Sequence, residues 1–293
     1  MSPGKKSFWP ITHQRANVAN QQTRRNAMAL DAAQFVGSIP ENYDKGLGPR
    51  IFTGYADDLT RRVAGLNPGS VLELAAGTGI LSRKLRDALP DDCDLTVSDL
   101  NPPMLEVAKQ KFRPDEPVKF ETIDAMDLKF AEACFDVVLC QFGVMFFPDK
   151  GRSYAEVCRV LKPGGSYLFN VWDTWQKNPF ARITHEVVEA FFPENPPGFY
   201  KVPFGYNNAK EIEESLLKAG FSRVTIEHLA IKSAIPSAAD FAKGLVFGNP
   251  VYDEVVTRGG NPDKLCTAVA DAIDRQLGQE MPLQALIVHA TKT

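Results

Sequence analysis

The alternation of apolar and polar positions is clearest at residues 71–85, where a short apolar run is followed by glycines and then by helical spacing. The run 71–74 carries a single acid, Glu73, and glycines follow at positions 77 and 79. Apolar residues then recur at Ile80, Leu81 and Leu85, which is the spacing of an amphipathic helix. This stretch predicts a buried strand, a tight turn and a helix in succession.

The same alternation continues along the chain. Apolar runs that predict strands occupy residues 93–99, 118–123, 135–142, 166–172, 222–231 and 283–290. Helical spacing lies before and between them, for example at Tyr55, Leu59 and Val63. The run 135–142 is apolar enough to be a central strand that is covered on both faces. Strands that alternate with helices in this way predict an α/β fold.

Composition narrows the class of protein. A chain of 293 residues with 44% hydrophobic residues fits one enlarged α/β domain, or a domain with a cap. The net charge of −3 at pH 7 gives no basis for nucleic-acid binding, and no run long enough for stable membrane insertion is visible. We therefore expect a small, neutral or lipophilic substrate. The five cysteines form no Cys-x-x-Cys pair, which favours a reducing, cytoplasmic compartment.

Residues 1–30 stand apart because they carry Lys5, Lys6, Arg15, Arg24 and Arg25 but no acid. Two early prolines and scarce apolar periodicity argue against an amphipathic helix there. We expect a basic, flexible N-terminal arm, with an organelle-targeting segment as the alternative. The globular domain then comprises residues 31–293.

The glycine turn and the strand ends that follow it carry the candidate chemistry. Glycines let a ligand approach the backbone, and a helix start offers N–H groups, so we expect a nucleotide-like cofactor. Asp99 ends the second strand, roughly 20 residues beyond the turn, where a carboxylate accepts both hydroxyls of a ribose. Asp124, or its rival Asp127, follows the third strand. Gln141 and Phe142 end the fourth strand, at the crevice where open α/β sheets bind ligands.

Residues 73–79, an acid followed by small or apolar residues and then Gly-x-Gly, resemble motif I of the class I S-adenosylmethionine-dependent methyltransferases. Ala75 stands where many members carry another glycine. Residues 159–165, Arg-Val-Leu-Lys-Pro-Gly-Gly, match a recurrent signature of that family. The resemblance covers residues 40–172 and extends to ubiquinone and menaquinone methylases and natural-product methyltransferases. It implies a Rossmann-like, seven-stranded mixed sheet, with S-adenosylmethionine as cofactor and S-adenosylhomocysteine as product.

The resemblance also implies which residues hold the cofactor. Leu100 and Met104 would flank the adenine, and Asp124 would read its edge. Tyr43 matches a tyrosine that closes over the cofactor, although the alternative that it only packs the first helix stays open. The positions that match the family's cofactor site are Tyr43, Glu73, Ala75, Gly77, Gly79, Asp99, Leu100, Met104, Asp124, Ala125, Gln141 and Phe142.

Two inserts distinguish this chain within the family. Residues 174–206 interleave aromatic residues with prolines, and residues 236–281 separate the last two strands. If the family topology holds, both leave from the ligand side of the sheet, so we expect lid insertions over an apolar acceptor pocket. The alternative is that their aromatic residues form a homodimer contact or a small core of their own.

The transfer chemistry makes modest demands on side chains. Positive charge on sulfur is neutralised as the new bond forms, so positioning can dominate and no catalytic residue is strictly required. A poorly acidic acceptor needs a base, for which the candidates are His185, His228 and Asp173. Each histidine has a surface or packing role as its alternative. No metal-ligand pattern appears in the sequence, and we expect no metal.

The sequence therefore predicts a methyltransferase that acts on a small, apolar or aromatic acceptor at O, N or C. The size of the second insert favours a specialised small-molecule enzyme over a quinone-precursor C-methylase. One alternative is a regulatory or scaffold protein that binds S-adenosylmethionine without turnover. The other is a nicotinamide-dependent oxidoreductase, which needs a third glycine where this chain continues with Ile80, Leu81 and Ser82.

Overall fold

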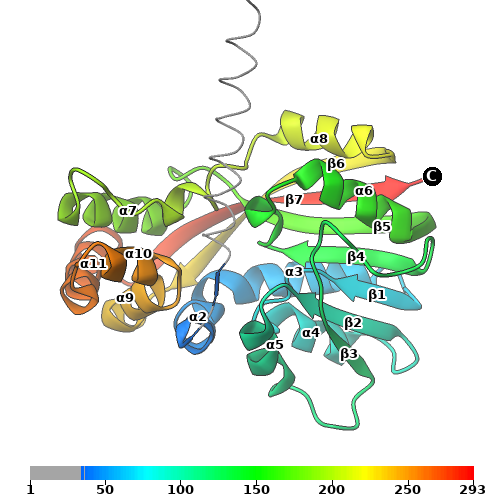
Figure 1. The fold of residues 1–293 in the computed structure, drawn as a ribbon, viewed down its shortest axis with the longest axis horizontal. Helices are drawn as coiled ribbons and strands as arrows, with labels where there is room; N and C mark the ends of the chain where they lie inside the picture. The colour runs from blue at the N-terminus through cyan, green and yellow to red at the C-terminus, as the bar shows by residue number, and fades with distance from the viewer. Residues whose placement is uncertain (1–33, 36) are drawn as a thin grey trace, which may run out of the picture.

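Seven strands form one mixed sheet at the centre of the protein, in a computed structural model that describes residues 34, 35 and 37–293. Their spatial order is β3-β2-β1-β4-β5-β7-β6 (Figure 1). Strands β1 to β5 pair in parallel, whereas β7 is antiparallel to both β5 and β6. The bounds are β1 Ser70–Glu73, β2 Asp94–Asp99, β3 Val118–Thr122, β4 Phe135–Gln141, β5 Leu161–Trp172, β6 Phe221–Ala234 and β7 Glu280–Lys292. The predicted seven-stranded mixed sheet is confirmed, and the predicted basic arm lies outside the described residues.

Helices flank this sheet in two groups, with α3 packed against α4 and α6 packed against α8. Helix α5 contacts β2 and β3. In the part of the chain that the structure describes, no helix is both long and apolar enough to cross a membrane. The bounds of the flanking helices are α3 Thr53–Ala64, α4 Ile80–Ala88, α5 Pro102–Lys109, α6 Lys150–Val160 and α8 Ala209–Lys218.

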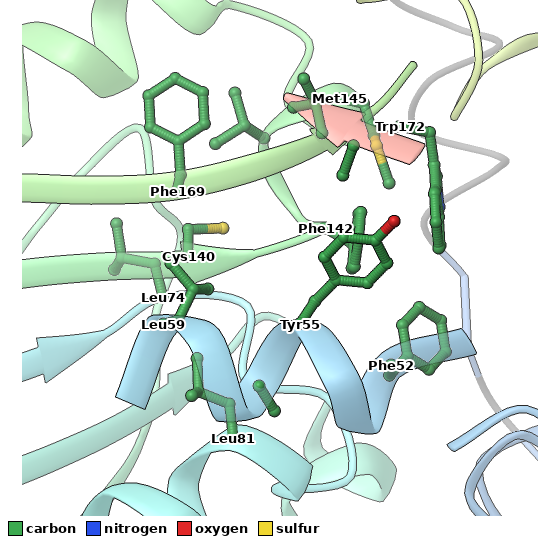
Figure 2. Packing of buried hydrophobic residues seen from close by; sticks show 14 of the residues in the cluster. Phe52, Tyr55, Leu59, Leu74, Leu81, Cys140, Phe142, Met145, Phe169 and Trp172 are labelled. Carbon is green, nitrogen blue, oxygen red and sulfur yellow. The ribbon is translucent and has the colours of Figure 1, made fainter. Parts of the chain in front are cut away.

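Helix α3 fixes the packing at the carboxyl edge of the sheet. Its apolar spacing buries Tyr55 and Leu59 completely, as the sequence predicted. Figure 2 shows Tyr55 directed from α3 toward Phe142, which follows β4, and Trp172, which ends β5. The Tyr55 ring meets both edge-on, at centroid distances of 5.2 and 5.6 Å, the geometry that aromatic quadrupoles favour. The edge of the sheet that binds ligands in such folds is thus walled by aromatic rings.

The two inserts fold into one helical group together with α2. Helix α9 contacts both α2 and α11, and α7 contacts α11, so the group is continuous beside the sheet (Figure 1). A Cβ on Gly46 would lie 2.5 Å from the Cα of Gly244, so α2 and α9 touch through their backbones. The bounds are α2 Ile39–Gly46, α7 Pro179–Phe191, α9 Ala238–Phe247, α10 Val251–Thr257 and α11 Pro262–Leu277, with short helical turns η1 Gly48–Phe52, η2 Val144–Phe146 and η3 Phe199–Lys201.

Candidate functional site

A cavity opens at the carboxyl ends of β1, β2 and β4. The strand order reverses between β1 and β4, so the cavity spans the point of reversal. We call it the strand-end cavity. Its volume is about 890 Å³, which includes space open to solvent. Its lining residues are Phe35, Tyr43, Leu74, Ala75, Gly77, Asp99, Leu100, Asn101, Met104, Ile123, Asp124, Ala125, Met126, Gln141, Phe142, Gly143, Phe146, Phe147 and Pro148.

The turn after β1 brings backbone groups to this cavity. Ala75, Gly77 and Gly79 all have left-handed φ angles, of 50°, 57° and 78°. A Cβ on Gly77 would meet nothing within 4 Å, so this glycine leaves open space at the cavity wall. Gly79 has another role, because a Cβ there would lie 2.8 Å from the Cβ of Ala108 in α5. Gly79 thus permits close packing of α5 and, unlike Gly77, does not line the cavity.

Asp99 is held rigidly at the end of β2. Its Oδ2 accepts a hydrogen bond of 2.8 Å from the Gly77 amide, and its Oδ1 accepts one of 2.8 Å from the Asn101 amide. Burial raises the pKa of this carboxyl, and the two amides partly oppose that rise. The predicted neighbours Leu100 and Met104 line the same cavity. The glycine turn and the second strand end are therefore joined through one carboxylate.

Glu73 lies beneath the turn, with a side chain that is 1% exposed, and does not line the cavity. Among the described residues neither carboxyl oxygen has a hydrogen-bond partner within 3.5 Å. Burial raises the pKa of Glu73 to about 8, and the nearby Ser82 hydroxyl moderates the rise. Near neutral pH the carboxyl is therefore mainly protonated, which removes the cost of an unpaired buried charge.

The third strand leads to Asp124 and Ala125, which both line the cavity. Asp124 Oδ1 accepts a 2.9 Å hydrogen bond from the Met126 amide, which shapes the turn. Asp127, the rival candidate, pairs instead with Lys129 at 2.5 Å and does not line the cavity. The structure thus brings Asp124, and not Asp127, to the site.

The end of β4 contributes Gln141 and Phe142. Gln141 Oε1 is buried without a hydrogen-bond partner in the described residues, so it is an available acceptor beside the cavity. Phe142 has a left-handed φ of 51°, which is strained for a residue with a side chain. The Oδ1 of the buried Asn170 holds this conformation by accepting a 2.9 Å hydrogen bond from the Phe142 amide. Sequence analysis missed Asn170, whose only signal was one polar residue in a buried strand.

A second cavity, which we call the aromatic cavity, shares the wall formed by Phe35, Tyr43, Phe142 and Phe146. Its volume is about 440 Å³, which includes space open to solvent. None of the residues known to line it carries a charge at neutral pH. They are Phe35, Tyr43, Leu47, Ile51, Phe52, Phe142, Met145, Phe146, Trp172, Phe180, Phe199, Tyr200, Pro203, Phe204, Leu245 and Asn249.

Stacked rings form one side of the aromatic cavity. Tyr43 stacks on Phe52 with ring centroids 4.9 Å apart. Phe142 stacks on Trp172 at 3.9 Å, and Phe204 covers Trp172 at 5.8 Å (Figure 2 shows the Phe142–Trp172 pair). Tyr43 packs against the core and also lines both cavities, and its role toward the cofactor stays a prediction. Burial raises the pKa of its hydroxyl, as does the negative charge of Asp99.

The three candidates for a general base lie elsewhere. His228 Nδ1 is 2.9 Å from Asp173 Oδ2, so these two pair with each other. His185 is buried in α7, where its Nε2 lies 3.0 Å from Glu189 Oε1. None of the three lines either cavity, and their catalytic role stays a prediction.

The chain is similar to known methyltransferases over part of its length. Residues 71–165 match a family model described as a methyltransferase domain. The demethylmenaquinone methyltransferase of Deinococcus radiodurans is 34% identical over 157 residues, which cover 52% of this chain and 62% of the relative. A ubiquinone/menaquinone biosynthesis C-methyltransferase of Shewanella halifaxensis is 38% identical over 109 residues, covering 36% of this chain and 43% of the relative. The chain spans about half the length of the curated relatives it matches.

Solved structures share the fold at low sequence identity. A phosphoethanolamine N-methyltransferase of Haemonchus contortus, solved with S-adenosyl-L-methionine, has a TM-score of 0.59 and 16% identity, over 90% of this chain and 59% of that one. The YcgJ protein of Bacillus subtilis has a TM-score of 0.54 and 18% identity, over 82% of this chain and 98% of that one. At these identities the likeness shows the fold alone.

Proposed function

We propose that this chain, which belongs to the class I S-adenosylmethionine-dependent methyltransferases, transfers a methyl group from that cofactor to a small apolar or aromatic acceptor. The observation that carries the proposal is the pair of cavities that share a wall at Phe142. One is lined by a carboxylate, an amide and a glycine turn, and the other by aromatic rings. Adjacent sites of such different character fit a nucleotide-like donor beside an apolar acceptor.

The residues at the strand-end cavity fit the family's cofactor. Gly77 leaves open space where any side chain would protrude, and Gln141 has a buried oxygen without a partner. Asp99 would hold the ribose hydroxyls, with Leu100 and Met104 beside the adenine and Asp124 and Ala125 at its edge. Gln141 and Phe142 would meet the methionine part. Ala75 would line the cofactor's cavity at the turn, and Glu73 and Gly79 would support the turn from beneath.

When bound, S-adenosylmethionine supplies a methyl group that is activated on a sulfonium. The chain's own contribution is then positioning, which is worth up to roughly 7–11 kcal/mol in well-oriented reactions. Phe142 and Tyr43 line both cavities, so they would set how closely the acceptor approaches the donor. The aromatic walls would exclude water from the reacting atoms.

The character of the aromatic cavity supports an uncharged acceptor. A carboxylate or phosphate that entered it would lose its hydration, and no cation in the described lining would compensate. An apolar ring would instead gain contact with side chains that are already ordered. The regulatory or scaffold alternative predicted a blocked acceptor side, and an apolar cavity that opens beside the strand-end cavity favours turnover over that alternative. We also propose a cytoplasmic location, which the five free cysteines support.

The experiment is a labelling assay with methyl-labelled S-adenosylmethionine and a metabolite extract, followed by mass spectrometry of labelled products. We expect one or a few labelled products, and much less labelling with the Asp99→Ala variant. Binding of S-adenosylhomocysteine without any labelled product would favour the scaffold alternative. Binding of NADH in preference to S-adenosylhomocysteine would favour an oxidoreductase.

A further inference from the structure

Asn249 is the one side-chain amide among the residues described around the aromatic cavity. It follows helix α9 and is 6% exposed. It lines the aromatic cavity but not the strand-end cavity. A polar group in an otherwise apolar pocket fixes the orientation of a ligand, so the partners of this amide matter.

The amide nitrogen of Asn249 already has a partner. Leu245 lies in the last turn of α9, where carbonyl groups have no donor within the helix. The Leu245 carbonyl accepts a 2.7 Å hydrogen bond from the Tyr200 hydroxyl and a 3.1 Å hydrogen bond from Asn249 Nδ2. Together, Tyr200 and Asn249 cap the helix with their donors.

This cap fixes which way the amide faces. A flipped amide would set Asn249 Oδ1 against the Leu245 carbonyl, and both atoms only accept hydrogen bonds. The Tyr200 hydroxyl gives its single hydrogen to the same carbonyl and cannot also donate to Asn249. Asn249 Oδ1 is thus left without a donor among the described residues, and it is not one of the fully buried unpaired atoms. Because Asn249 lines the aromatic cavity, Oδ1 is the acceptor that this residue can offer a ligand there.

We infer that the methyl acceptor is an uncharged aromatic compound that carries a hydroxyl or N–H group, and that this group donates a hydrogen bond to Asn249 Oδ1. The inference rests on the proposed function. A carboxylate would place its lone pairs against Oδ1, which makes an anionic acceptor unfavourable. A cation would lose its hydration in this cavity, and the described lining holds no carboxylate to pair with it.

The donor group is distinct from the atom that receives the methyl group. Methyl transfer must occur near the wall that the two cavities share, where Phe142 and Tyr43 lie. Asn249 belongs to the aromatic cavity alone. The acceptor is therefore bifunctional, and its product keeps the hydroxyl or N–H group that Asn249 recognises.

Equilibrium dialysis with model compounds tests the inference in the presence of S-adenosylhomocysteine. The probes are 1-naphthol, its methyl ether 1-methoxynaphthalene, which cannot donate, and the cation 1-naphthylmethylammonium. We expect the wild-type protein to bind 1-naphthol roughly fivefold to tenfold more tightly than the ether, as one hydrogen bond provides. Equal binding of the two, or tightest binding of the cation, overturns the inference without any variant.

Two variants test whether Asn249 causes the preference for 1-naphthol over its methyl ether. Asn249→Leu should reduce it to less than about twofold, because the oxygen is lost while the apolar wall remains. Tyr200→Phe is the matched control, since it weakens the same helix cap but leaves Asn249 Oδ1 in place, and it should keep the preference. Retention of the preference in Asn249→Leu, or its loss in Tyr200→Phe, contradicts the assignment. Calorimetry with S-adenosylhomocysteine separates the two proposals: absent binding defeats the proposed function, whereas normal binding without a donor preference defeats only this inference.

Discussion

The two cavities that meet at Phe142 are built in different ways. The strand-end cavity is built at the ends of neighbouring strands, around left-handed turns at Ala75 and Gly77 and a carboxylate, Asp99, that ties two strand ends together. The aromatic cavity is made by side chains from segments between Phe35 and Asn249. One site is therefore a property of the sheet, and the other depends on how the inserts pack against it.

This difference determines which changes each site tolerates. Directional hydrogen bonds from a fixed backbone recognise one ligand, and any side chain added at the turn interferes with it. Apolar walls recognise a ligand by contact area, so a smaller ring at one position loses only part of the binding energy. One substitution should therefore abolish ligand binding in the strand-end cavity, whereas one in the aromatic cavity should only weaken ligand binding there.

The sharpest test of this difference is Gly77→Val. Its φ of 57° strains a β-branched residue, and the new side chain would enter the open space at the cavity wall. We expect the affinity for S-adenosylmethionine to fall on the order of 100-fold or more, which corresponds to about 2.7 kcal/mol, as measured by calorimetry. Gly164→Val is the matched control, because Gly164 has a φ of 78° and open space around its Cβ but lies away from both cavities.

Both valine variants should lose a similar stability, about 1–2 kcal/mol for a left-handed residue with a Cβ. Only Gly77→Val should lose cofactor binding. Equal cofactor affinity in the two variants would show that the turn does not contact the cofactor.

The strand-end cavity was predictable because its parts are local in sequence. The turn at Gly77 and the strand ends at Asp99 and Asp124 each follow an apolar run, and parallel strands bring their carboxyl ends to one edge. The structure even shows why Ala75 looked out of place, since its φ of 50° is one that glycine adopts without strain.

The sequence predicted that an apolar pocket would form, but it did not predict which residues line the aromatic cavity. Aromatic and proline richness indicated an apolar pocket, yet the same prolines hid helix α7 (Pro179–Phe191), which begins with a proline at its first position. Asn249 gave no sequence signal, and Asn170 gave only that of one polar residue in a buried strand. Their roles depend on Leu245 and Phe142, which they meet only in the folded chain. The histidines were proposed from residue type alone, and neither lines a cavity.

The next largest effect is expected at the carboxylate that joins the two strand ends. Asp99→Ala removes a group that would accept both ribose hydroxyls, and it also frees the Gly77 and Asn101 amides. We expect S-adenosylmethionine binding to weaken by roughly 1.5–3 kcal/mol in calorimetry, with the fold retained. Asp94→Ala, at the opposite and exposed end of β2, is the control and should bind normally. An unchanged affinity in Asp99→Ala would remove this residue from the cofactor site.

Glu73, which lies beneath the turn, predicts how the stability of the protein depends on pH. Its pKa is near 4.5 when unfolded and about 8 when buried in the folded protein, so the folded state binds the proton more tightly. Its contribution to stability is therefore complete below pH 4.5 and is lost as pH rises toward 8, at no more than about 1.4 kcal/mol per pH unit. Glu73→Gln removes this loss.

In urea unfolding, we expect the stability of Glu73→Gln relative to wild type to increase by about 2 kcal/mol between pH 5.5 and 7.5. The control Glu213→Gln, at an exposed position of α8, accounts for the loss of one negative charge. A constant difference across this pH range would mean that Glu73 is ionised in the folded protein and has found a partner.

The smallest expected effect gives the most direct test of whether the two cavities are separate sites. Phe204 lines only the aromatic cavity and stacks on Trp172, whereas Met104 lines only the strand-end cavity. Phe204→Leu removes ring contact worth about 1 kcal/mol, so the KM for the acceptor should rise roughly fivefold while the Kd for S-adenosylmethionine stays within twofold. Met104→Ala should show the reverse pattern, with a weaker cofactor and a nearly unchanged acceptor KM. Steady-state kinetics with one substrate varied at a time measures both quantities. If each variant affected both ligands equally, the cavities would form one site, and the contrast between a backbone site and a side-chain site would not hold.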